Sequence, residues 1–292
     1  MPEASRAPVR GEPFRVRTED GATLVGEVYP PAGEPDPALP TVVLAHGWTL
    51  NRTVWSRVIR GLHAQGEYTV VTYDQRGHGQ SSPGTAPASI PQLGRDLHAV
   101  IDAAVDTPRL VLGGHSMGGM TIMAYAGQHP ADLLARVERV VLLGTAAAEV
   151  ERPGLVGLVE TGVMRVAAHG PRVPAGVFVR NRHQRHLNFG DDPDPRDVKL
   201  VRKAIAGTSI RDMGQYFTAL EALDERASLA ALGTISTTIL VGEKDRLTPV
   251  SYARALHHGI PGSRLIELPG KGHMLGYEAP EVVVDALVAD PN

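Results

Sequence analysis

The chain has 292 residues, of which 42% are hydrophobic and 21% are charged, so it is long enough to bury a large core. Its formal net charge of −3 provides no basic excess for binding nucleic acid or an anionic membrane surface, and we expect neither partner. The absence of cysteine from the sequence excludes disulfides, thiolate metal sites and a cysteine nucleophile.

The first residues, "MPEASRAPVRGEPF", carry prolines and charges where a signal peptide needs an apolar run. No later stretch of the sequence has the length and hydrophobicity of a membrane span. We therefore predict a cytoplasmic protein with no membrane partner, and the sequence leaves its oligomeric state open.

Two strands are expected first, at residues 14–18 and 22–29, and the short "EDG" turn between them requires an antiparallel hairpin. Short β-branched runs then alternate with amphipathic stretches of helical length. This alternation predicts an α/β fold, with a mostly parallel sheet and helices on both faces. The later strands are expected at 41–45, 68–73, 109–113, 139–144, 237–242 and 264–268.

The alternation stops at residues 146–226, where the sequence indicates helices separated by prolines. We call residues 146–226 the cap segment, and we predict that it covers a core made of residues 1–145 and 227–292. Within it, Met213, Tyr216, Phe217 and Leu220 recur at helical spacing and form one apolar face. Such a face usually packs against the core, but it could also line a substrate pocket.

The sequence "GGHSMGG" at 113–119 places Ser116 between a predicted strand and a predicted helix. Gly-x-Ser-x-Gly in this setting is the pattern of a nucleophile elbow, a tight turn that exposes the serine hydroxyl above the sheet. Taken alone, the pattern would fit a glycine-rich turn with a capping serine about equally well. A base and an acid at other strand ends would decide between the two interpretations.

Both groups are available in the order typical of such sites. His273 lies in "PGKGHML", just beyond the last predicted strand, and Asp245 lies in "EKDRLTP", just beyond the strand before it. Glu243 competes with Asp245 for the role of the acid. We predict Ser116 as nucleophile, His273 as general base and Asp245 as the group that orients the base.

Donors for a developing oxyanion are predicted from the glycine turn "LAHGWT" and from the start of the helix after Ser116. The backbone N–H groups of Trp48 and Met117 are the candidates. The Trp48 side chain is also a candidate for lining a pocket together with Met213, Tyr216, Phe217 and Leu220.

Five motifs, "HGW", "DQRGHGQS", "GHSMGG", "GEKDRLTP" and "GKGH", resemble the α/β-hydrolase superfamily in their order and spacing. The similarity is to its capped serine hydrolases, which include esterases, perhydrolases and carbon–carbon bond hydrolases. It implies an eight-stranded sheet, a helical cap at residues 146–226, and the triad Ser116, Asp245 and His273. Serine at the elbow separates this chain from the similar branches that carry aspartate there.

We expect hydrolysis of a small to medium carboxylic ester or lactone, a small-molecule substrate, through a Ser116 acyl-enzyme. The alternatives are perhydrolysis, acyl transfer or carbon–carbon bond cleavage by the same triad, and a ligand-binding receptor built on the same fold. His183 and His186 have no identified third ligand for a metal, and the basic run "RNRHQRH" precedes an acidic one. We predict no metal and no cofactor.

Overall fold

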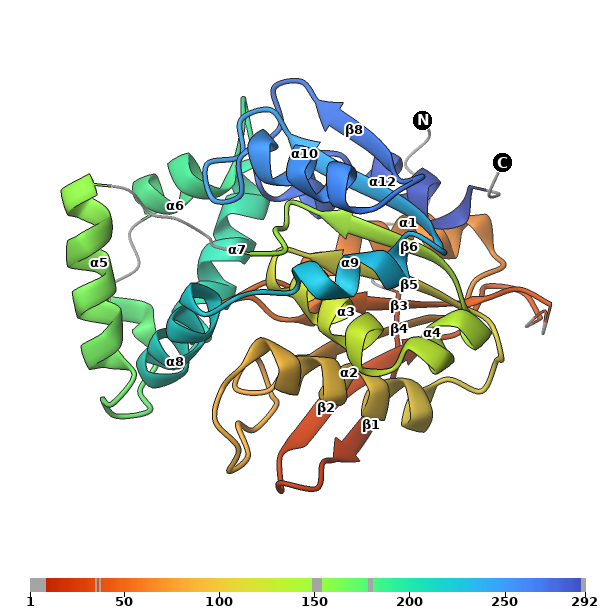
Figure 1. Cartoon of the computed structure of the whole chain (residues 1–292), viewed down its shortest axis with the longest axis horizontal. Coiled ribbons are helices and arrows are strands. Elements are labelled where there is room, and N and C mark those ends of the chain that lie inside the picture. The colour runs from red at the N-terminus through yellow and green to blue at the C-terminus, as the bar shows by residue number, and fades with distance from the viewer. Residues whose placement is uncertain (1–8, 35, 37, 149–153, 178–180, 290–292) are drawn as a thin grey trace.

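The computed structural model describes residues 9–34, 36, 38–148, 154–177 and 181–289. Its centre is an eight-stranded sheet in the order β1-β2-β4-β3-β5-β6-β7-β8 (Figure 1). β2 pairs antiparallel with β1 and β4, and every other neighbouring pair is parallel. The strands are β1 Glu12–Arg17, β2 Thr23–Tyr29, β3 Thr41–Ala45, β4 Val70–Asp74, β5 Leu110–His115, β6 Val137–Leu143, β7 Ser236–Gly242 and β8 Arg264–Leu268.

The predicted α/β fold and its eight-stranded, mostly parallel sheet are confirmed. β3 and β8 have the predicted bounds, and the other predicted strands differ by a few residues at their ends. β3 and β4 are buried along their whole length. Parallel strands covered on both faces are expected to be continuously apolar, which explains why the strand "TVVLA" could be predicted from the sequence.

Helices cover both faces of this sheet. On one face α2, α3, α9 and α10 pack into a cluster around Leu93, Met123 and Leu256. On the other, α1, α11 and α12 pack around Val58, Leu275 and Val283. The helices of the core are α1 Ser56–Gln65, α2 Ile90–Ala104, α3 Met117–Gln128, α4 Pro130–Arg136, α9 Leu229–Leu232, α10 Val250–Gly259, α11 Leu275–Glu278 and α12 Pro280–Val288, with 3₁₀ turns at Arg52–Trp55 and Arg226–Ser228.

Between β6 and β7, the described residues of the cap segment form helices and no strand of the sheet. These are α5 Gly154–Ala167, α6 Asn181–Asn188, α7 Pro195–Gly207 and α8 Ile210–Glu221, with a 3₁₀ turn at Ala175–Val177. Figure 1 shows them gathered at one end of the sheet, with α5 outermost. The chain enters and leaves this region side by side, because Glu225 N–H donates to the Ala147 carbonyl at 2.7 Å.

None of the helices in the described ranges combines the length and hydrophobicity needed to cross a bilayer.

A buried arginine joins three segments on the side of the sheet that carries α2. Arg76, in the loop after β4, is 1% exposed and binds both carboxylate oxygens of Asp96 on α2, at 2.5 and 2.6 Å. It also donates to both oxygens of Asp20 in the β1–β2 turn, at 2.7 and 3.1 Å, and to the Pro83 carbonyl at 3.2 Å. All five guanidinium N–H groups can therefore be satisfied.

Asp96→Asn should lower the free energy of unfolding by about 3–5 kcal/mol, because it leaves the buried Arg76 charge with one anionic partner in place of two. Urea denaturation measures the effect. Asp102→Asn on the same helix is the matched control, since the Asp102 side chain is 56% exposed and its ion pairs should be worth about 1 kcal/mol or less. Equal losses in the two variants would contradict the prediction.

Candidate active site

Ser116 occupies the tight turn between β5 and α3. Its φ of 54° and ψ of −120° are unusual for a residue other than glycine. A Cβ at Gly114 would lie 2.6 Å from the Gly118 carbonyl oxygen, and one at Gly118 would lie 2.0 Å from the Ala45 carbonyl oxygen. No side chain fits at either position, so the flanking glycines are required by backbone contact.

The turn also leaves Ser116 partly exposed. Ser116 is half-buried, whereas His115 and Met117 on either side are buried. Its N–H donates to the Leu143 carbonyl at the end of β6, at 2.8 Å, and its own carbonyl accepts from the Thr145 hydroxyl at 2.7 Å. The strained residue is thus tied by its backbone to the end of β6, and these two hydrogen bonds do not involve its side chain.

His273 and Asp245 form a buried hydrogen-bonded pair. His273 Nδ1 lies 2.8 Å from Asp245 Oδ2, and the Thr248 hydroxyl donates to the same oxygen at 3.0 Å. The other oxygen, Oδ1, accepts from the backbone N–H groups of Leu247 and Thr248, each at 2.9 Å. This geometry assigns the proton to Nδ1 of His273 and leaves Nε2 as an acceptor.

Burial on its own would raise the pKa of Asp245. The attraction of His273 and the hydrogen bonds from His273, Thr248 and Leu247 outweigh burial and hold this pKa below its usual value. Asp245 is therefore a carboxylate at neutral pH, as a group that stabilises an imidazolium must be.

The end of β6 brings the serine and the histidine–aspartate pair to one place. Leu143 accepts the Ser116 amide, and the next residue, Gly144, has a φ of +49° and lies against the pair. A Cβ at Gly144 would be 3.0 Å from Asp245 Oδ2 and 3.2 Å from His273 Nδ1. Ser116, Asp245 and His273 therefore surround two consecutive backbone residues.

Glu243, the competing acid, is exposed, and its carboxylate accepts from the Gly270 N–H at 3.3 Å. Asp245, by contrast, is the carboxylate that contacts His273. The geometry favours Asp245.

The two segments predicted to donate to an oxyanion meet beside Ser116. A Cβ at Gly47 would lie 3.1 Å from Ser116 Cβ, and Trp48 is the next residue. Met117 is the first residue of α3, where helix N–H groups have no partner within the helix. The Gly47 carbonyl accepts from Nδ1 of buried His46, at 2.8 Å. Both backbone segments are thus held where an oxyanion next to Ser116 could be bound.

The predicted pocket residues divide into two groups. Trp48 donates its indole N–H to the Met213 carbonyl at 3.2 Å, and its ring lies 6.0 Å from that of Phe217. Tyr216 is 1% exposed and packs on His78, and Leu220 is buried in the same core cluster. Met213 and Phe217 therefore join α8 to Trp48, while Tyr216 and Leu220 pack α8 onto the core.

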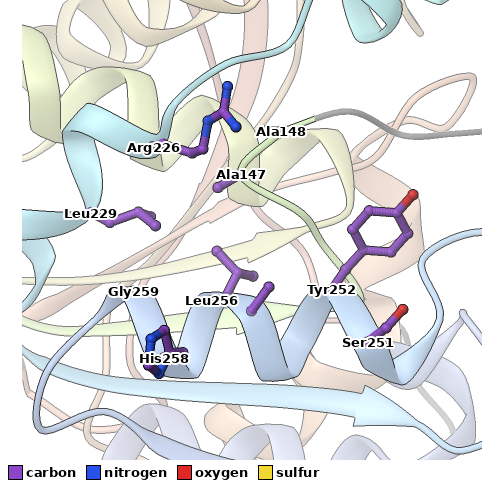
Figure 2. Close-up of a pocket in the computed structure, with 10 residues that line it drawn as sticks. Ala147, Ala148, Arg226, Leu229, Ser251, Tyr252, Leu256, His258 and Gly259 are labelled. Carbon is purple, nitrogen blue, oxygen red and sulfur yellow. The ribbon is translucent and has the colours of Figure 1, made fainter.

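A cavity of about 620 Å³ lies elsewhere, between α10, Leu229 of α9 and the start of the cap segment. Figure 2 shows Tyr252 and Leu256 of α10 on one side of it and Ala147 on the other. None of the predicted site residues is among those that line it.

Among the described residues, no group of three or more His, Cys, Asp or Glu side chains is arranged to hold a metal ion. His186 is exposed, and the His183 side chain lies outside the described residues.

The sequence did not predict that Thr248 contacts Asp245 or that His115 contacts His273. The position of Thr248, three residues after Asp245, is a signal of a side-chain-capped turn that could have been used.

Known proteins similar to this chain include hydrolases. Over 281 residues the chain is 27% identical to the AB hydrolase superfamily protein YisY of Bacillus subtilis, covering 94% of this chain and 97% of that one. It is also 27% identical to 3-oxoadipate enol-lactonase 1 of Acinetobacter baylyi, covering 91% and 92%. The structure of an esterase from Exiguobacterium antarcticum superposes with a TM-score of 0.76 at 22% identity, covering 94% and 97%.

Residues 40–280 match the model of a protein family whose description is "alpha/beta hydrolase fold". This range runs from the start of β3 to the start of α12 and includes every residue discussed at the elbow, the acid turn and the histidine loop. The chain belongs to the α/β-hydrolase family.

Proposed function

We propose that this chain hydrolyses a carboxylic ester or lactone of small to medium size, through a covalent acyl-enzyme on Ser116. The observation that carries the proposal is the buried Asp245–His273 hydrogen bond of 2.8 Å beside a strained, half-buried serine. The similarity to an enol-lactonase over most of both chains supports the ester or lactone class.

In the first half of the reaction, His273 Nε2 takes the proton of the Ser116 hydroxyl as Oγ attacks the substrate carbonyl. The carbonyl oxygen gains negative charge, which the Trp48 and Met117 N–H groups stabilise. The imidazolium then gives its proton to the leaving alkoxide, and the alcohol departs. Asp245 stabilises the imidazolium throughout, because its carboxylate is held ionised and oriented by Thr248 and Leu247.

In the second half, a water molecule gives a proton to His273 Nε2 and attacks the acyl carbon. The tetrahedral intermediate collapses, Ser116 Oγ leaves with the proton from His273, and the acid is released. A lactone follows the same steps, except that its alcohol stays attached to the acid product.

An aryl fluorophosphonate should label Ser116 and no other residue, because only a serine activated by a base reacts readily with it. Mass spectrometry of the labelled peptide measures the site. Ser116→Ala should lose both labelling and turnover of p-nitrophenyl acetate while keeping its thermal melting profile. Ser81→Ala, which alters a hydroxyl outside the proposed triad, controls for nonspecific labelling. Turnover by the Ser116→Ala variant would contradict the assignment of Ser116 as the nucleophile.

Asp245→Asn should lower kcat by about 10⁴, since the amide cannot stabilise the imidazolium and favours the wrong tautomer of His273. Stopped assays of ester hydrolysis at fixed pH measure the effect. Glu243→Gln is the matched control and should keep near-normal kcat, because Glu243 is exposed and binds a loop amide. A larger loss from the Glu243 variant would show that the acid is misassigned.

Across p-nitrophenyl esters of increasing acyl length, kcat/KM should peak at short or middle lengths, because we expect the Trp48–Phe217 contact to limit the space between α8 and the loop that holds Trp48. Phe217→Ala should move the peak to longer chains by opening that space. Val166→Ala on α5, whose side chain is 76% exposed, should not. Rates that keep rising to long chains in the unaltered protein would refute the substrate class.

The same assay set separates the alternative chemistries. Replacing water by hydrogen peroxide or a second alcohol, or the ester by a diketone, would reveal perhydrolysis, acyl transfer or carbon–carbon cleavage as faster reactions of the same triad. Labelling of Ser116 without turnover of any of these substrates would favour a ligand-binding role.

A further inference from the structure

His115, the residue before the nucleophile, is a buried imidazole that the proposed reaction does not use. Its side chain is 3% exposed. Its ring stands edge-on to the buried Trp55 ring, with centroids 6.5 Å apart and planes at 90°. On another side it faces the His273 ring, with centroids 4.6 Å apart. The imidazole therefore lies directly beside the proposed general base.

One hydrogen bond links His115 to the loop after β8 that holds His273, which we call the base loop. His115 Nε2 lies 2.9 Å from the backbone carbonyl of His273. A carbonyl oxygen can only accept, so Nε2 carries the proton and donates it. The elbow that holds Ser116 and the loop that holds His273 are 158 positions apart in the chain, and this contact joins the residue adjoining one catalytic group to the backbone of the other.

The second ring nitrogen lies beside the loop that holds Gly47 and Trp48, which we call the oxyanion loop. His115 Nδ1 is buried and finds no hydrogen-bond partner among the residues that the structure describes, and a Cβ at Gly47 would lie 3.0 Å from it. Nδ1 therefore lies against the backbone just before Trp48. A single imidazole thus contacts the base loop and the oxyanion loop, and it belongs to the elbow itself.

The environment keeps His115 uncharged. Burial, followed by the repulsion of His273, lowers the pKa of His115 to about 3, against the opposing effects of the His273 carbonyl and Asp245. The ring is therefore neutral near pH 7. A neutral ring is required here, because a second cation beside His273 would oppose the imidazolium formed when Ser116 loses its proton.

We propose that His115 is a positioning residue that acts as a neutral Nε2–H donor to the His273 carbonyl and sets the distance between His273 and Ser116. The inference rests on the proposed function. Removal of the donor should lower kcat with little change in KM, because substrate contacts remain while the reacting atoms lose their alignment.

Two amide variants test the donor while keeping a polar side chain. In His115→Gln the amide nitrogen reaches the position of Nε2 and can still donate to the carbonyl. In His115→Asn the amide nitrogen reaches only the position of Nδ1. We expect kcat within about tenfold of the unaltered protein for Gln, the scale of one imperfect hydrogen bond, and about a hundredfold lower for Asn, the scale of a small misplacement. KM should stay similar in both.

His129→Gln is the control, since it makes the same replacement just beyond the opposite end of α3, and its activity should be unchanged. Thermal melting checks folding of every variant. The rate of fluorophosphonate labelling at Ser116 should follow kcat in the same order, which measures alignment without substrate turnover. Equal losses in the Gln and Asn variants, or a change confined to KM, would overturn the inference.

The tautomer can be read in the unaltered protein by ¹⁵N-detected histidine NMR, with the His115 signals assigned by their loss in His115→Gln. We expect a neutral ring protonated at Nε2 from pH 5 to 9. A charged ring, or one protonated at Nδ1, would refute the inference even if the His115→Asn variant failed to fold. Failure of the unaltered protein to hydrolyse any ester or lactone would instead count against the proposed function.

Discussion

At the ends of the parallel strands, chain segments lie in unusually close contact, and the proposed site can form only while these contacts are kept. Gly118 lies against the Ala45 carbonyl, Gly47 against Ser116, and Gly144 against the carboxylate of Asp245. A Cβ at Gly118 would push two backbone segments apart, and a Cβ at Gly47 or Gly144 would require its neighbours to shift by a few tenths of an ångström. The proposed site therefore depends on segments packed closely at one edge of the sheet, which carry the side chains that we propose to react.

This constraint explains why polar groups can be buried there. Asp245 has hydrogen-bond donors for both oxygens, and His46 uses both nitrogens, because Nδ1 donates to Gly47 and Nε2 accepts from the Gln75 amide. Burial lowers the pKa of His46 far below its usual value, so it stays neutral. Because these groups are hydrogen-bonded and either neutral or paired, they support the proposed site without introducing competing charge.

The cap segment is joined to the proposed site by two hydrogen bonds from side chains to backbone carbonyls. Trp48 donates to the Met213 carbonyl on α8, and the Thr208 hydroxyl donates to the Thr49 carbonyl at 3.0 Å. Both core partners belong to the loop proposed to stabilise an oxyanion. A displacement of α8 would therefore be felt at the position of the substrate carbonyl, and we propose that substrate size is selected where the cap segment meets this loop.

The sheet, its interruption by helices and the triad candidates could be predicted from the sequence alone, because continuous apolar strands and glycine-bounded turns are local patterns. It left Glu243 and Asp245 as competitors, and only the tertiary structure placed Asp245 against His273. The apolar face of α8 could be predicted from the sequence. The sequence did not show that Phe217 on this face contacts Trp48 whereas Tyr216 packs on the core. The contacts of His115 were invisible for the same reason, since they join residues far apart in the chain and depend on how the completed sheet brings its strand ends together.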